Sequence, residues 1–254
     1  MGSFNLQFDP SFIEETVFLY AKACAYTEKA LIDDFHQARE ALYTKECPGE
    51  ERDKDFQLLW ADYFKKMGLR KTLENILMEF PLLSGPRIFI FIKRAWNKKQ
   101  EDVELFARGE EDQKRVCIGL QAARMLDKPF LETFLRHELT HISDMLDSDF
   151  QYDPRISLGG KTELEDNLIR DRFHLLWDIY INLRLVRKGF PMNSSLDQQR
   201  GIFERLFSRW DGQKRESVFE QITTNENYTH ENLLKLACCS RINNLPVLKE
   251  TPRA

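Results

Sequence analysis

The sequence predicts an α+β fold that is predominantly helical, in which a small sheet is followed by two long helices. Three observations support this prediction. Apolar residues recur at three- and four-residue spacings over residues 11–43 and 53–80. Short runs rich in β-branched and aromatic residues follow between residues 87 and 120. From residue 129 onward, long helical patterns occupy most of the chain.

The composition is that of a chain able to fold without a partner. With 254 residues, 42% hydrophobic and 31% charged, it can bury a substantial core. We expect one domain over residues 1–254, made of a helical N-terminal part (1–80), a core (87–190) and a helical C-terminal part (191–254).

Charge and cysteine usage exclude several classes of protein. A net charge of −4 gives no global attraction to nucleic acid or to an anionic membrane. Five cysteines without CxxC spacing argue against a disulfide framework and favour reduced thiols, as in the cytoplasm. The first thirty residues contain four acidic side chains and no secretory pattern, and no apolar run is long enough to span a bilayer.

The N-terminal elements follow in order from these patterns. Helical stretches are expected from Ser11 to about Tyr43 and from about Asp53 to Phe80, broken at Cys47-Pro48-Gly49. Pro81 and the turn Ser84-Gly85-Pro86 end this region. Strands are then expected over three short segments: RIFIFIKRA from Arg87, Val103 to Ala107, and Arg115 to Leu120.

The remaining elements are helical. One long helix begins near Pro129, and a second, roughly Thr162 to Lys188, follows a Gly159-Gly160 loop and stops at Gly189. Two further helical stretches are expected near Ser195 to Trp210 and Tyr228 to Cys239, and the tail after Asn243 looks loose.

The motif HELTH, residues 137 to 141, points to a metal site on the first of these long helices. Residues four apart lie one turn apart on the same face, so His137 and His141 can bind one ion. Glu138 lies about 100 degrees around the helix, where it can address a metal-bound water. An apolar stripe places both histidines at the edge of a buried face: Leu131, Leu135, Leu139, Ile142 and Leu146.

This arrangement predicts metal-assisted hydrolysis. Zinc lowers the pKa of a bound water toward 7 and polarises a carbonyl, while Glu138 takes the proton of the water and passes it to the leaving amine. The alternative is a core helix whose histidines are merely hydrogen-bonded.

A catalytic zinc ion takes three protein ligands, so a third is expected downstream. Asp178 is favoured because it lies in LWDIYIN, between apolar residues, where a carboxylate is costly unless it meets a cation. Four alternatives stay open: His174, Glu163, Glu165 and Asp147. Asp144 lies about 10 Å along the helix from His137, too far for a common ion, and fits a supporting or capping role.

Further polar residues have two interpretations each. Asn182 either orients Asp178 or binds substrate, or is an ordinary exposed asparagine, and Asp171 is expected on a solvated face. The oxyanion needs a donor besides zinc, and the sequence does not choose among Tyr152, Tyr180, Tyr228 and His230.

The HELTH helix resembles that of the zincin metallopeptidases, and a downstream ligand helix resembles the gluzincin layout, with Asp178 in place of the usual glutamate. LWDIYIN is also similar to a helix of bacterial metallopeptidases that accompany von Willebrand-type modules, where AADxxIN follows HExxH. The resemblance covers roughly residues 87 to 190. It implies a small sheet before the active-site helix, with an edge strand that pairs with substrate, and the segment Val116 to Gln121 is similar in position.

The chain also departs from well-known zincins. It lacks the metzincin glycine and third histidine, and it lacks the NExxS-type glutamate helix of thermolysin-like enzymes. This puts the substrate class in doubt, and the resemblance extends to the superfamily alone.

Two functions are therefore considered. The first is a cytoplasmic zinc (Zn2+) metallopeptidase acting on a peptide or protein, with His137, His141 and Asp178 as ligands and Glu138 as general base. The second is a non-catalytic binding or regulatory protein in which the metal stabilises helix packing. Neither nucleic acid nor a membrane is an expected partner, and the sequence gives no oligomeric state.

Overall fold

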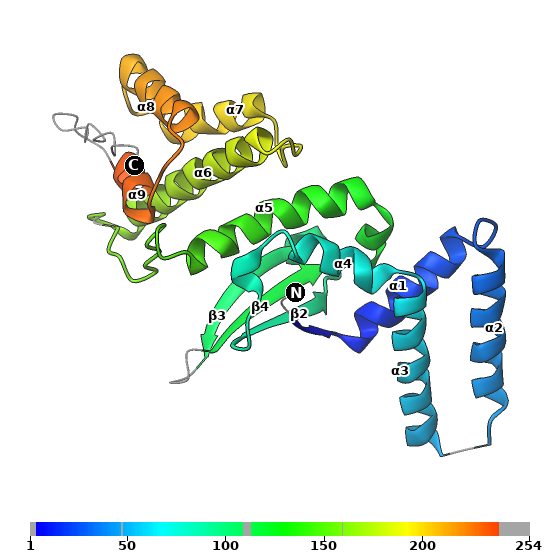
Figure 1. The fold of residues 1–254 in the computed structure, drawn as a ribbon. Helices are drawn as coiled ribbons and strands as arrows, with labels where there is room; N and C mark the ends of the chain where they lie inside the picture. The colour runs from blue at the N-terminus through cyan, green and yellow to red at the C-terminus, as the bar shows by residue number, and fades with distance from the viewer. Residues whose placement is uncertain (1–3, 47, 109–112, 159, 239–254) are drawn as a thin grey trace, which may run out of the picture. The chain divides into compact units, whose positions relative to one another are not determined.

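The computed structural model describes residues 4–46, 48–108, 113–158 and 160–238. They form two compact units, Met1–Leu146 and Asp147–Ala254. The first unit combines a sheet with helices and the second is helical (Figure 1). The predicted α+β, predominantly helical fold class is confirmed, while the predicted single domain stays a prediction.

The helices of the first unit are more numerous than the sequence pattern suggested. They are α1 (Pro10–Ala23), α2 (Lys29–Thr44), α3 (Gly49–Lys66), α4 (Leu69–Leu77) and α5 (Lys128–Leu146), with short 3-10 turns η1 (Pro81–Leu83), η2 (Lys98–Gln100) and η3 (Ala122–Leu126). Each of the two predicted helical stretches is split in two. Gly68 separates α3 from α4 because its φ of 73° is a left-handed conformation that glycine adopts at little cost.

The sheet has the order β1-β2-β4-β3, with strands Asn5–Phe8, Ile88–Arg94, Gln113–Leu120 and Asp102–Arg108 respectively. The first three strands in this order run parallel, and β3 runs antiparallel to β4. The three predicted strands are confirmed. The segment Val116 to Gln121 is not an edge, however, because β4 pairs with β2 on one side and with β3 on the other. The expectation that this segment is an edge strand is wrong.

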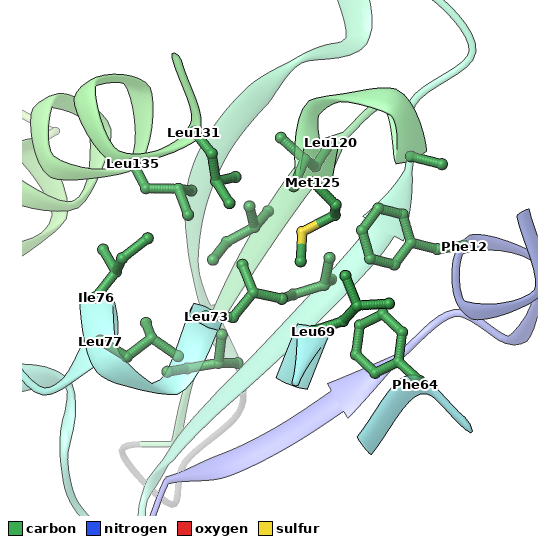
Figure 2. Close-up of a cluster of buried hydrophobic side chains, with 14 of the residues drawn as sticks. Phe12, Phe64, Leu69, Leu73, Ile76, Leu77, Leu120, Met125, Leu131 and Leu135 are labelled. Atoms are coloured by element: carbon green, nitrogen blue, oxygen red, sulfur yellow. The ribbon is translucent and has the colours of Figure 1, made fainter. Parts of the chain in front are cut away.

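One face of the sheet forms the core of the first unit. Alternate residues of β2 and β4, among them Ile90 and Ile118, are fully buried there. Figure 2 shows the side chains that pack in this core, from α1, α3, α4, β4, η3 and α5: Phe12, Phe64, Leu69, Leu73, Ile76, Leu77, Leu120, Met125, Leu131 and Leu135. The core thus fixes one face of α5 within this unit.

The second unit consists of α6 (Glu163–Arg187), α7 (Leu196–Leu206), α8 (Gly212–Thr224) and α9 (His230–Cys238), with α6 packed against the other three. The predicted long helix is confirmed: the Thr162 side chain caps its start, and Gly189 follows its end with φ 83°. The stretch to Trp210 is helical as far as Leu206, and α8 was not predicted. Gly159, Cys239 and the tail after Asn243 lie outside the described residues.

No helix of the described residues is both long and apolar enough to cross a membrane.

Candidate metal centre

Helix α5 is held in a fixed rotation within the first unit. Leu135, Leu139 and Ile142 are buried in the core. One residue before the HELTH motif, the Arg136 guanidinium donates to both oxygens of Glu79, at 2.8 and 2.9 Å. This anchor was not predicted, because its partner lies 57 residues away and nothing in the sequence relates the two. It holds the next turn of α5, which carries the histidines.

His137 and His141 lie side by side on α5, as their spacing predicts. Their ring centroids are 5.1 Å apart with an interplanar angle of 74°. His137 is buried and His141 is half-buried. Two imidazoles one turn apart can both direct a nitrogen at one ion.

Glu138 lies next to His137, since its Oε1 is 3.1 Å from His137 Nδ1. The Glu138 side chain is 26% exposed and is therefore reachable by water. A histidine that donates its Nδ1 proton to a carboxylate binds metals through Nε2. Glu138 Oε2 has no polar partner among the described residues, so it is available to a water molecule.

Asp178 lies in the middle of α6 and is half-buried between the buried Trp177 and Ile179. His137, His141 and Asp178 each offer one ligand atom, and these atoms lie within 4.8 Å of one another. Two imidazole nitrogens and one carboxylate oxygen are a donor set that zinc accepts. The three side chains favoured from the sequence are therefore brought together, and their binding of a metal stays a prediction.

The other candidate ligands do not belong to this group among the described residues. Asp147 follows α5 and accepts a hydrogen bond from Asp149 N at 2.9 Å, as a turn residue does. Glu165, in the first turn of α6, accepts from Lys161 N at 2.7 Å. Glu163 and His174 are exposed, whereas Asp144 is buried.

Asn182 fits neither of its two interpretations. It is fully buried, its Oδ1 accepts from Asn193 N at 3.2 Å, and its Nδ2 donates to Ser194 Oγ at 3.4 Å. It therefore tethers the segment after α6 to the helix. Asp171 is exposed, as expected.

Three of the four candidate oxyanion donors have structural partners in the second unit. The Tyr180 hydroxyl donates to Glu226 O at 3.2 Å, and the Tyr228 hydroxyl donates to Gln221 O at 2.8 Å. Burial raises the pKa of Tyr228 to about 12. His230 is buried, and its Nδ1 accepts from Asp153 N at 3.3 Å.

Tyr152 differs from the other three donors. Burial raises the pKa of its phenol, which keeps the O–H protonated, and the ring lies 5.8 Å from that of Trp177. Its hydroxyl has no hydrogen-bond partner among the described residues, so of the three candidate tyrosines it is the one whose proton is not donated to a backbone carbonyl.

Comparison of the chain with protein-family models, with curated proteins and with solved structures finds no match. A functional argument therefore rests on the residues of the site themselves.

Proposed function

We propose that this chain is a zinc-dependent peptidase in which His137, His141 and Asp178 hold the ion and Glu138 is the general base. The observation that carries the proposal is the grouping of three ligand atoms within 4.8 Å, with a carboxylate next to the first histidine. Three protein ligands are the number that a catalytic zinc uses, because a fourth position must be left for water or substrate.

The reaction is hydrolysis of a peptide bond without a covalent intermediate. A bound zinc ion supplies a Lewis acid that lowers the pKa of water and polarises a carbonyl. Glu138 accepts the proton of the attacking water through Oε2 and delivers it to the leaving amine. Through Oε1 the same carboxylate orients the His137 ring. Tyr152 is the proposed donor to the oxyanion.

An extended peptide can bind along β3. This strand pairs with β4 on one side, and its other side has no strand partner in the described sheet. Helix α5 packs against β3 within the first unit, so the open edge belongs to the strand beside the histidine-bearing helix. Backbone pairing with an open edge binds peptides with little dependence on their sequence.

A cytoplasmic location is part of the proposal. Cys24, Cys117 and Cys238, the cysteines of the described residues, form no disulfide with one another, as is usual in a reducing compartment. The net charge of −4 supports a peptide or protein substrate better than nucleic acid.

Metal analysis tests the ligand set. The purified chain should hold near-stoichiometric zinc, and His137→Ala and Asp178→Ala should lose it. Asp171→Ala is the matched control on α6, because Asp171 is exposed and lies outside the ligand group. Zinc retained by both ligand variants, or lost equally by the control, would remove the proposed centre.

Glu138→Gln tests the chemistry separately from the metal. This variant should keep its zinc and lose about 10²- to 10⁴-fold in hydrolysis of a mixed quenched-peptide substrate, because the general base is gone. Cobalt substitution should show three protein ligands and a water. A site closed by four protein ligands, with loss of folding on metal removal, would instead favour the non-catalytic, metal-stabilised protein.

A further inference from the structure

A cavity of about 410 Å³ lies in the first unit, between α1, α2 and α3 and the end of β2. Figure 1 shows α2 and α3 side by side, and both α1 and α2 pack against α3. The volume falls in the range of small-molecule sites, roughly 300 to 1,000 Å³. None of its lining residues belongs to the proposed metal centre.

Arg39 of α2 supplies a cation to this cavity without an anionic partner. Its guanidinium carbon lies 5.8 Å from the centre of the Phe35 ring, and it forms no ion pair with the described residues. Its Nε is buried and has no hydrogen-bond acceptor there. A buried donor without an acceptor is costly, and a ligand oxygen would satisfy it.

The other charged groups of the wall are one ion pair and one additional carboxylate. Arg94 Nε lies 2.6 Å from Glu15 Oε2, although this N–H is not aligned for a hydrogen bond and also lacks an acceptor. Glu14, which precedes Glu15 in α1, has no partner among the described residues. Because Arg94 and Glu15 neutralise each other, the guanidinium of Arg39 and the carboxylate of Glu14 are the remaining charges of the wall.

Aromatic rings form the rest of the wall. Trp60 is 9% exposed, whereas Phe18 and Tyr43 are 50% and 59% exposed. Tyr43 is braced by Phe56, with ring centroids 5.1 Å apart. Rings that border a cavity and remain open to solvent offer an apolar surface on which a flat ligand can stack.

We propose that this cavity binds a free α-amino acid with an aromatic side chain. The carboxylate of the ligand pairs with Arg39, which can bind it through two N–H groups. Its ammonium pairs with Glu14, and its ring lies against Trp60, Phe18 and Tyr43. A zwitterion matches the one remaining charge of each sign, whereas a simple anion would face Glu14 without compensation.

The test is calorimetric titration of the full chain with L-tryptophan as the probe. Saturable binding is expected. N-acetyl-L-tryptophan lacks the ammonium and L-tryptophanamide lacks the carboxylate, so each should bind at least about tenfold more weakly, as expected for loss of one charge-assisted contact. L-Alanine, which lacks the ring, should not bind detectably.

Variants assign each contact. Arg39→Gln should weaken L-tryptophan binding at least about tenfold and leave the binding of L-tryptophanamide unchanged. Glu14→Gln should weaken L-tryptophan binding at least about tenfold and leave the binding of N-acetyl-L-tryptophan unchanged. Glu40→Gln and Lys29→Gln, exposed charge changes on α2 that do not line the cavity, should match the parent chain. Circular dichroism confirms folding.

Three results would overturn the proposal. The first is the absence of saturable L-tryptophan binding by the parent chain, and the second is equal affinity in the parent, Arg39→Gln and Glu14→Gln. Indole-3-propionate binding as tightly as L-tryptophan would also exclude a zwitterion site. These outcomes are independent of peptidase activity, because no residue of the metal centre is changed.

Discussion

At the scale of single residues, one buried side-chain amide of the second unit is unsatisfied. Gln199 of α7 is 2% exposed, and neither its nitrogen nor its oxygen has a hydrogen-bond partner among the described residues. Replacing it with Met should raise the free energy of unfolding by about 1 kcal/mol, because two unsatisfied polar atoms are removed. Urea denaturation measures the change. Gln213→Met, at an exposed position, should have little effect, and destabilisation by Gln199→Met would show that the amide has a partner.

A second residue makes stability depend on pH. Burial lowers the pKa of His230 below its usual 6.5, against a smaller opposing effect of Asp153. His230 is therefore neutral in the folded chain and takes up a proton more readily when unfolded. Its contribution to stability is complete above about pH 6.5 and is lost as the pH falls below that value, by up to about 1.4 kcal/mol per pH unit.

Urea denaturation between pH 7.5 and 5 measures this dependence. His230→Phe, which keeps a ring beside Tyr152 and Phe173, should flatten the profile of the second unit. An unchanged slope in that variant would assign the dependence to other groups.

The sequence predicts the residues of the candidate metal centre to different degrees. His137, Glu138 and His141 follow from one motif, because helical geometry alone places them together. The apolar neighbours of Asp178 favour it as the third ligand, but the sequence does not separate it from other carboxylates, because the hydrogen bonds of Asp147 in a turn and of Glu165 at a helix start depend on the folded backbone. Arg39 and Glu14 gave no signal, because the cavity that relates them is formed by the packing of helices.

At the scale of elements, Gly119 on β4 allows the segment that contains Gln100 and Asp102 to approach closely. A Cβ on Gly119 would overlap Gln100 O and lie 2.6 Å from Asp102 Oδ1. Gly119→Ala should therefore destabilise the first unit by about 1–3 kcal/mol. In contrast, a Cβ on Gly201 in α7 meets nothing within 4 Å, so Gly201→Ala should stabilise the chain by about 0.5–1 kcal/mol. Thermal unfolding checks both, and equal effects would contradict the packing argument.

The spacing of apolar residues predicts most of the elements, but it does not predict those with weak local signals. The strand at Arg87 and the two long helices follow from composition and spacing, as the structure bears out. Strand β1 has four residues and pairs with a segment far along the chain, so nothing local marks it. Helix α8 buries one face with few apolar residues, Val218, Phe219 and Ile222, so its apolar pattern is short, although Asp211 caps its start through its side chain. Strand order could not be derived, because it depends on pairing between distant segments.

At the scale of the whole molecule, the first unit has a core of its own. Every residue of the main buried cluster lies between Phe12 and Ile142. A chain of residues 1–146 should therefore fold alone and unfold cooperatively in urea, with circular dichroism showing helix and strand. A gradual, non-cooperative transition would show that this unit needs the rest of the chain.

The pairing of β1 with β2 also determines when the sheet can be completed during synthesis. Asn5 lies opposite Phe89, and α1 to α4 are made between them. These helices can form from neighbouring residues as they emerge, whereas β1 must wait for a partner made much later. Closing such a long loop costs entropy before any strand contact is gained. Although β1 is made before the other three strands of this sheet, it is therefore among the segments that reach their final place late.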